Sequence, residues 1–153
     1  MTAIKIKIEG LDAVLAAISG LKTSIEHPDE RLTDRIGDAM LEDVDQRFAS
    51  RGYGTWAPLS LRTIKRKGHS NILVDSGVMR ASTTVAKNVN EVVLTVPRGG
   101  RNGSAAVPGY HQRGTGRMPQ RKIVDVTPQL MARLRDALAK WISNLVADFG
   151  RTK

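Results

Sequence analysis

The sequence predicts one α+β domain spanning residues 1–153, in which three main helices pack on a small, mostly antiparallel β-sheet. In three long segments the apolar residues recur every three or four positions, which is typical of amphipathic helices. Shorter segments alternate apolar and polar residues or are rich in valine and threonine, which favours strands. A long glycine-rich loop at 97–108 precedes the last helix. The length of 153 residues suits a single domain.

The N-terminal third is predicted to contain a strand and two helices. Isoleucines alternate with charged residues at 4–8, which predicts a half-buried strand. A helix then starts at Leu11 and breaks at His27-Pro28, because the residue before a proline disfavours helical geometry. The second helix carries acidic residues on its outward faces and stops near Arg51-Gly52. Its apolar residues lie four positions apart: Leu32, Ile36, Met40, Val44 and Phe48.

Residues 52–67 are predicted to form a loop followed by a short basic helix. The loop contains Tyr53 and Trp56, and the helix begins at the cap-like Ser60 and ends before Gly68. Further along, side-chain oxygens of an Asp-Ser pair are expected to cap one helical turn, and two strands follow, joined near residues 88–90. The capping pair and the strand segment are Asp75, Ser76 and 83–96.

The C-terminal part is predicted to contain an exposed, mobile loop, a short strand and a long helix. The loop is 97–108 and the strand is 123–126. Thr127 caps the final helix, Pro128 occupies its favoured first position and Gly150 closes it. One face of this helix is apolar and is assigned to the core, with Trp141 as a candidate interface residue: Leu130, Leu134, Leu138, Trp141, Leu145 and Phe149.

Charge is distributed unevenly along the chain, whose net charge is +9. Residues 1–50 carry six Lys or Arg and ten Asp or Glu, whereas residues 51–126 carry thirteen and three. An acidic front and a basic middle can attract each other between identical subunits. The same basic segment can face DNA phosphates, and a merely solvated surface is the third interpretation.

The composition argues against several classes of protein. No cysteine is present, which excludes disulfides, thiolate metal ligands and a cysteine nucleophile. No apolar run approaches the roughly 18 residues of a membrane span, and the first residues lack the layout of a signal peptide. These features predict a protein that is made in a reducing cytoplasm and has no membrane partner.

Catalytic, metal and nucleotide sites are not favoured by the motifs. Asp75, Ser76 and His111 are residue types found in hydrolases, but no nucleophile elbow surrounds Ser76 and helix capping explains the pair. The glycine-rich 98–104 lacks the Gly-Lys-Ser/Thr ending of a P-loop. The histidines show no metal-ligand spacing: His27, His69 and His111. We expect no catalytic residues, no metal and no cofactor.

Nucleic-acid contact is harder to dismiss, because basic residues cluster in two short segments. The chain has no zinc finger, RRM signature or helix-turn-helix, so a sequence-specific reader is not indicated. Phosphate contact or contact between subunits needs only the charges. The candidate interface residues are Arg62, Lys65, Arg66, Arg80, Arg113, Arg117 and Arg121.

An ordered series of short motifs then becomes recognisable. The series is Trp56-Ala57-Pro58-Leu59-Ser60, Thr63, Lys65, the stretch 72–82 containing Asp75-Ser76-Gly77 and Arg80, Tyr110-His111-Gln112-Arg113-Gly114, and Met118-Pro119-Gln120-Arg121 before a C-terminal helix. It resembles the signature region of phage virion morphogenesis proteins, the Mu-like and P2-like tail completion group. That group is similar to the neck head-to-tail joining proteins of siphophages. The resemblance extends from about Leu11 to the last helix.

The resemblance implies a structural protein rather than an enzyme. Such a chain would be made in the host cytoplasm and end in the virion, at the neck or the tail end. It would form a ring, a hexamer by analogy, between a head-side connector and the tail terminator, with non-specific contact to DNA in the channel left open. Acidic helices in 11–48 would meet the basic 51–122 face of the next subunit.

Several motif residues are expected to hold the fold rather than to react. Asp75 and Ser76 would cap the turn that Gly77 permits, directing Arg80 toward a neighbour or its own acidic helix. The others would anchor loops or fix turns: Trp56, Pro58, Leu59, His111, Gln112, Pro119 and Arg121. The alternatives are a tail terminator or minor tail protein of related fold, and a basic DNA-binding accessory protein acting outside the virion.

Overall fold

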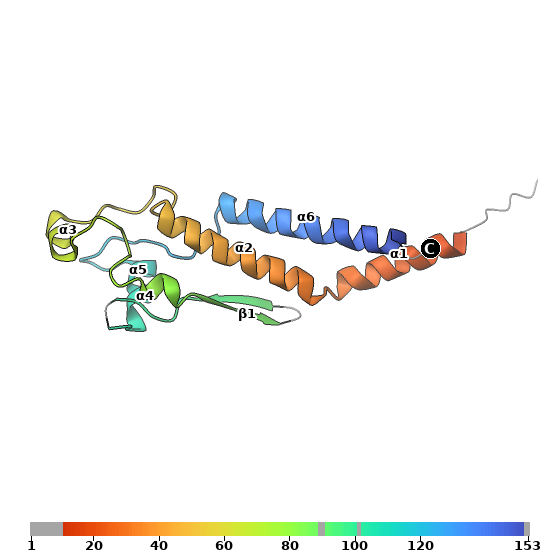
Figure 1. Ribbon diagram of the computed structural model, residues 1–153, viewed down its shortest axis with the longest axis horizontal. Helices are drawn as coiled ribbons and strands as arrows, with labels where there is room; N and C mark the ends of the chain where they lie inside the picture. Colours follow the sequence, from red (N-terminus) through yellow and green to blue (C-terminus); the bar gives the residue numbers. More distant parts are fainter. Residues whose placement is uncertain (1–10, 89–90, 101, 152–153) are drawn as a thin grey trace, which may run out of the picture.

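The computed structural model describes residues 11–88, 91–100 and 102–151, which form an α+β structure with six helices and a two-stranded antiparallel sheet. The molecule is elongated, with α3 and α5 at one end and α1 at the other (Figure 1). The strand expected at 4–8 lies outside the described residues. The elements are α1 (Leu11–Glu26), α2 (Glu30–Ala49), α3 (Leu61–Lys67), α4 (Val78–Ala81), β1 (Thr84–Asn88), β2 (Glu91–Thr95), α5 (Ala106–Arg113) and α6 (Pro128–Arg151).

Helix α2 is the central element, because both strands and α6 pack against it. Helix α1 contacts α6 and continues beyond the end of α2 (Figure 1). In the described part of the chain it is therefore α2, rather than all three long helices, that packs on the sheet. The sheet comes close because α2 has a glycine there: a Cβ on Gly37 would lie 2.7 Å from the Lys87 side chain and 3.1 Å from that of Val85.

The apolar core consists of two clusters. The larger lies beside the C-terminal half of α2 and includes the loop residue Trp56, whose ring packs edge-on against Phe48 at a centroid distance of 5.8 Å. Its buried members are Val44, Phe48, Trp56, Ile72, Met79 and Ile123. The smaller cluster joins α2 to α6 through Leu32, Trp141 and Leu145. The larger cluster thus anchors the loops at the α3 end of the molecule.

Several local predictions are confirmed, because short-range signals determine them. Ser60 caps α3 by accepting a hydrogen bond from the Thr63 amide, and Gly68 ends the helix in left-handed conformation at φ 77°. Thr127 Oγ1 accepts from the Leu130 amide at the start of α6. The strands pair antiparallel from Thr84 opposite Thr95 to Asn88 opposite Glu91. Residues 89 and 90, in the expected turn, lie outside the described residues.

The prediction of a loop throughout 97–108 is wrong at its end, where α5 begins at Ala106. Pro108, the last residue of the predicted loop, is the third residue of α5. There its missing amide costs nothing, because first-turn amides have no partner within the helix. Pro108 and Gly99 are also buried, so this segment is not uniformly exposed. Gly99 and Ser104 form a small bridge among the described residues of this segment.

The strand expected at 123–126 does not form. The amides of Ile123 and Val124 donate to Gln112 Oε1 at 2.9 and 3.2 Å, and Gln112 Nε2 donates to the Val124 carbonyl at 2.6 Å. One side chain thus satisfies backbone groups that a partner strand would otherwise bind. Of the apolar residues in this segment, Ile123 is 1% exposed, Val124 is partly buried and Val126 is 77% exposed.

Three smaller predictions are also wrong. The N-cap of α4 is Gly77, at φ 78°, and no side chain caps that helix. Ser76 Oγ instead donates to the Gly100 carbonyl at 3.1 Å. Asp43 on α2 was expected to face outward with the other carboxylates, but it is 2% exposed. Helix α6 runs through Gly150 to Arg151, so that glycine does not close it.

Gly52 offers a test of how tightly the Trp56 loop is built. Its φ is 68°, and a Cβ there would lie 2.4 Å from Trp56 Cδ1. We expect Gly52→Ala to lower the free energy of unfolding by about 2–4 kcal/mol, from left-handed strain plus the clash with the indole. Gly54→Ala is the control, since its φ is 81° but nothing lies within 4 Å. Urea unfolding of both variants measures the cost of the clash. Equal losses of stability in the two variants would show that the clash with Trp56 contributes nothing.

Candidate functional site

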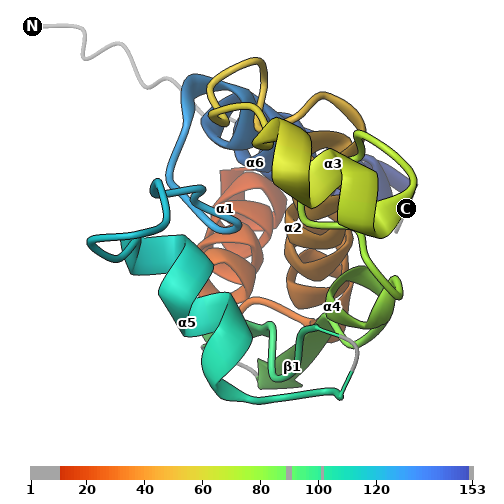
Figure 2. The same ribbon diagram turned by 90° about the vertical axis from the view of Figure 1, so that its left-hand side faces the viewer.

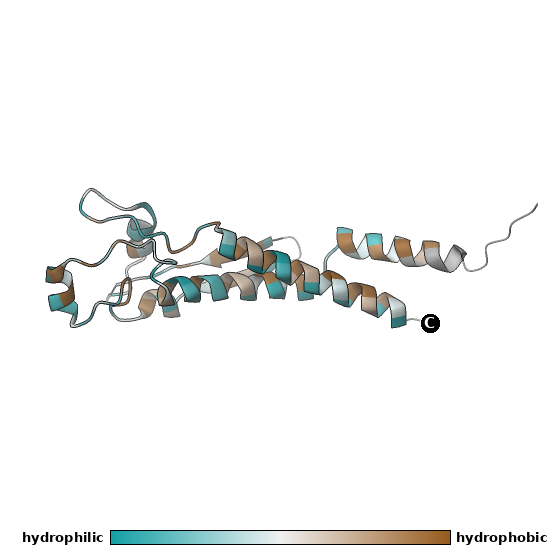
Figure 3. Ribbon diagram, turned by 90° about the horizontal axis from the view of Figure 1, so that it is seen from above, coloured by the Kyte–Doolittle hydropathy of each residue, from teal (hydrophilic) through white to brown (hydrophobic). Residues whose placement is uncertain are grey.

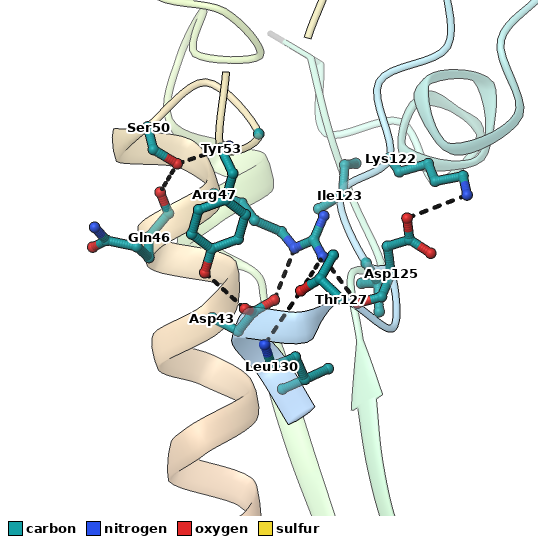
Figure 4. A network of polar contacts seen from close by, with 12 residues as sticks. Asp43, Gln46, Arg47, Ser50, Tyr53, Lys122, Ile123, Asp125, Thr127 and Leu130 are labelled. Atoms are coloured by element: carbon teal, nitrogen blue, oxygen red, sulfur yellow. Dashed lines mark hydrogen bonds and ion pairs between the residues drawn. The ribbon is translucent and has the colours of Figure 1, made fainter. Parts of the chain in front are cut away.

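A buried polar network fixes the segment between α5 and α6 to the end of α2 (Figure 4). Arg47 Nε donates to Asp43 Oδ2 at 2.8 Å, and both side chains are 3% exposed. Arg47 also donates through Nη2 to the Asp125 carbonyl at 2.9 Å and to Thr127 Oγ1 at 3.3 Å. Tyr53 OH donates to Asp43 Oδ1 at 2.7 Å. Burial, and then the Asp43 carboxylate, raise the pKa of Tyr53, so its hydroxyl stays a donor.

Two further side chains hold this segment against the Trp56 loop. The Arg121 guanidinium donates to the carbonyls of Ala57 and Pro58 at 3.0 and 3.1 Å. Trp56 Nε1 donates to the Lys122 carbonyl at 3.1 Å. Both acceptors are neutral backbone carbonyls, so these contacts hold the Arg121 guanidinium in place beside the loop without neutralising its charge.

A cavity of about 420 Å³ lies between these segments. Figure 2 looks onto this end of the molecule, where α3, α4 and α5 gather. Four cations line the cavity, together with one carboxylate, one histidine and several apolar side chains. The polar lining residues are Ser60, Thr63, Arg66, Lys67, Asp75, Ser76, His111, Arg117 and Arg121.

Burial and neighbouring charges shift the pKa values of two lining residues. Burial lowers the pKa of Lys67, and Arg66 and Arg121 lower it further, while Asp75 acts in the opposite direction. Burial also lowers the pKa of His111, and Arg121 and Lys67 add to that effect. His111 is therefore favoured in its neutral form, and its buried Nδ1 has no hydrogen-bond partner within the described structure. The lining is a partly desolvated site of positive charge.

The structure separates the seven predicted interface residues into three groups. Arg62, Lys65, Arg66, Arg113 and Arg117 are exposed, and none of their side chains forms an ion pair in the described part of the chain. Arg80 lies at the surface but pairs with Asp45 of its own α2 at 2.6 Å. Arg121 is a correction: it is 5% exposed and bound to backbone carbonyls, so it does not present a surface to a neighbouring subunit.

The other predicted motif residues gather around the same cavity. Its lining includes Pro58, Leu59, Asp75, Ser76, Gly77, His111 and Pro119. Trp56 is buried in the larger core cluster, and Gln112 forms hydrogen bonds with the backbone of 123–124. The hydrolase-like trio thus shares one cavity, but Ser76 donates to Gly100 rather than to His111. Among the described residues, no group of three His, Asp or Glu side chains is placed to hold a metal ion.

Trp141, a candidate interface residue, belongs to the core instead. It is 3% exposed, and its Nε1 donates to Asp29 Oδ1 at 2.9 Å. Sequence reasoning missed a different surface, formed by apolar residues that α2 does not cover. Helical spacing gave a signal for it, since Met131, Ile142 and Val146 extend the apolar arc of α6 beyond its buried face. Leu138, which the sequence assigned to the core, is 44% exposed and belongs to this uncovered surface instead.

Most of the acidic residues on α2 are already engaged within the chain. Asp45 pairs with Arg80, Asp34 pairs with Lys87 at 2.9 Å, and Glu42 pairs with Arg133. The expected attraction between an acidic front and a neighbour's basic face stays a prediction, and fewer carboxylates of α2 are left to take part in it.

No helix in the described ranges has the length and apolar content needed to cross a membrane. Neither a family model nor a curated protein nor a solved structure matches the chain.

Proposed function

We propose that this chain is a structural, non-enzymatic protein of a tailed bacteriophage virion, which completes the tail or joins it to the head as a ring of copies. The proposal rests on the resemblance of 56–82 and 110–121 to tail completion proteins. Its strongest support in the molecule is an apolar surface that α2 leaves uncovered on α1 and α6. A protein that functions as a monomer has little reason to expose such a surface.

The uncovered surface has two parts. On α1, Leu15, Ile18 and Ile25 are 52–58% exposed, although the helix is otherwise amphipathic. On α6, Leu138, Ile142 and Val146 follow one another every four residues and are 39–54% exposed. Figure 3 shows brown, apolar positions along α1, where the helix extends past the end of α2. A helix that projects from the body with apolar side chains exposed is suited to pack on a second molecule.

A second copy of the chain is the occupant we propose for this surface. The α1 patch and the α6 patch lie on different elements, so the α1 of one copy can cover the α6 patch of the next. Such a contact joins two different surfaces of identical subunits and closes into a ring when the rotation between subunits allows it. Elsewhere on the surface, the net acidic residues 1–50 of one copy can attract the net basic residues 51–126 of the next.

The test is electron microscopy of tailed particles assembled with the wild-type chain or with variants. We expect the wild-type chain to form a ring between the head-side connector and the tail, and Ile142→Lys to abolish its incorporation by placing a charge in the contact. Asn144→Lys is the matched control, because Asn144 is exposed on α6 outside the apolar stripe. Absence of the wild-type chain from the particles would overturn the proposal, as would equal incorporation of both variants.

Two alternatives give distinct results in the same work. A ring at the end of the tail tube without contact to a head connector would identify a tail terminator or minor tail protein. A DNA-binding accessory role is favoured by the exposed cations without ion pairs: Arg62, Lys65, Arg66, Arg113 and Arg117. Salt-sensitive binding of duplex DNA by the isolated chain, together with its absence from particles, would support that role.

A further inference from the structure

The cavity between α3, α4, α5 and 115–121 has more positive charge than its own residues neutralise. Four of its lining residues are cationic, Arg66, Lys67, Arg117 and Arg121, against the single carboxylate of Asp75. Arg66 and Arg117 form no ion pair in the part of the chain that the structure describes. Arg121 is held by two neutral carbonyls, and Lys67 donates to the Asn71 carbonyl at 2.8 Å. Neutral acceptors orient these cations but leave their charge uncompensated.

The cations come from both sides of the cavity and lie at different depths. Arg66 and Lys67 are on α3, whereas Arg117 and Arg121 are on the segment after α5. Arg121 is buried, Lys67 is half-buried, and Arg66 and Arg117 are exposed. Burial lowers the pKa of His111, and the charges of Arg121 and Lys67 lower it further. Repulsion of this kind is relieved when an anion enters the site.

The cavity also has the size and lining of a small-molecule site. Its volume of about 420 Å³ lies within the range of about 300–1,000 Å³ typical of ligand pockets. Its lining also includes apolar residues, among them Leu73, Met79, Val107 and Met118. The hydroxyls of Ser60, Thr63 and Ser76 provide additional polar groups on the lining. A site of this kind suits an anion that is part of a larger, partly apolar molecule.

We infer that this cavity binds a phosphate group, either as free phosphate or as the phosphate of a nucleotide. A carboxylate carries one negative charge, whereas a phosphate group carries about 1.5 to 2 at neutral pH and offers three acceptor oxygens. Guanidinium groups recognise such oxygens with paired N–H donors. The inference does not depend on ring assembly, because every residue involved belongs to one copy of the chain.

Calorimetric titration of the full chain with inorganic phosphate and with adenosine 5′-monophosphate tests the inference. We expect saturable binding at one site, weakened at least about tenfold in the Arg66→Gln/Arg117→Gln variant, because charge-assisted hydrogen bonds to the ligand are lost. The matched control is Arg62→Gln/Arg113→Gln, which removes the same charge from exposed arginines outside the cavity lining. The control is expected to bind as the wild-type chain does.

The two ligands identify the source of the phosphate. If the nucleotide binds more tightly than inorganic phosphate, its base contacts the apolar side chains of the lining. If the two ligands bind equally, the site is assigned to free phosphate. Absence of saturation would overturn the inference. Equal loss in both double variants, or succinate binding as tightly as phosphate, would also overturn it. If the Arg66/Arg117 variant does not fold, amide chemical shifts of the wild-type chain serve instead. Phosphate-induced shifts confined to residues other than 58–79, Gly100 and 107–121 would refute the site.

Discussion

Replacing Arg47 by methionine is expected to lower the free energy of unfolding by about 3–5 kcal/mol, because the Asp43 carboxylate is then buried without its counter-charge. Both side chains are 3% exposed, so water does not replace the lost partner. Arg47 also binds the Asp125 carbonyl and Thr127 Oγ1, so the same change frees the segment that leads into α6. The measurement is urea unfolding at neutral pH, followed by circular dichroism.

An exposed ion pair provides the matched control. Arg80→Met breaks the pair with Asp45, whose Nε–Oδ1 distance of 2.6 Å is shorter than that of the buried pair. Both partners are more than half exposed, and such pairs contribute about 0–1 kcal/mol. The double variant Asp43→Leu/Arg47→Met should recover much of the loss, because it removes both buried charges. Equal losses in Arg47→Met and Arg80→Met would refute the role of burial.

Replacing Trp141 by alanine is expected to cost about 3–5 kcal/mol, the usual range for removing a buried large aromatic residue. Trp141 is 3% exposed and packs with Leu32 and Leu145 in the smaller core cluster. Its Nε1 also donates to Asp29, the residue that immediately precedes α2. Loss of the indole therefore removes both the apolar contact and the hydrogen bond that join α6 to the start of α2.

Two further variants separate these contributions. Trp141→Phe keeps most of the apolar volume and is expected to cost about 1–2 kcal/mol for the hydrogen bond and the remaining gap. Leu138→Ala, on the same helix but 44% exposed, should change monomer stability by less than about 1 kcal/mol. Thermal unfolding at a concentration where the chain is monomeric compares the three. A loss of stability in Leu138→Ala as large as that in Trp141→Ala would contradict the assignment of Trp141, rather than Leu138, to the buried face of α6.

Much of the fold could be predicted from the sequence because neighbouring residues determine it. The break at Pro28, the caps at Ser60 and Thr127, and the glycine stop at Gly68 act over one helical turn. Apolar periodicity over sixteen or more residues was enough to locate α1, α2 and α6. The strand pair followed from two short β-rich runs close together in the chain.

What the sequence missed depends on residues far apart in the chain. Helix α5 forms around Pro108 because the proline falls in the first turn, a position that sequence inspection did not assign. Residues 123–126 look like a strand, but Gln112 takes the place of the partner strand. The cavity combines residues from 58 to 121, and its cations appeared in the sequence as two separate surface clusters.

By itself the sequence determined the α+β class, the long helices, the strand pair and the basic middle. Only the tertiary structure decided which charges are buried, which pair within the chain and which converge on one cavity. Asp43, Arg47 and Arg121 look like ordinary surface charges in the sequence, yet all three are buried. Burial depends on which segments pack together across the chain, and residue type alone does not encode that packing.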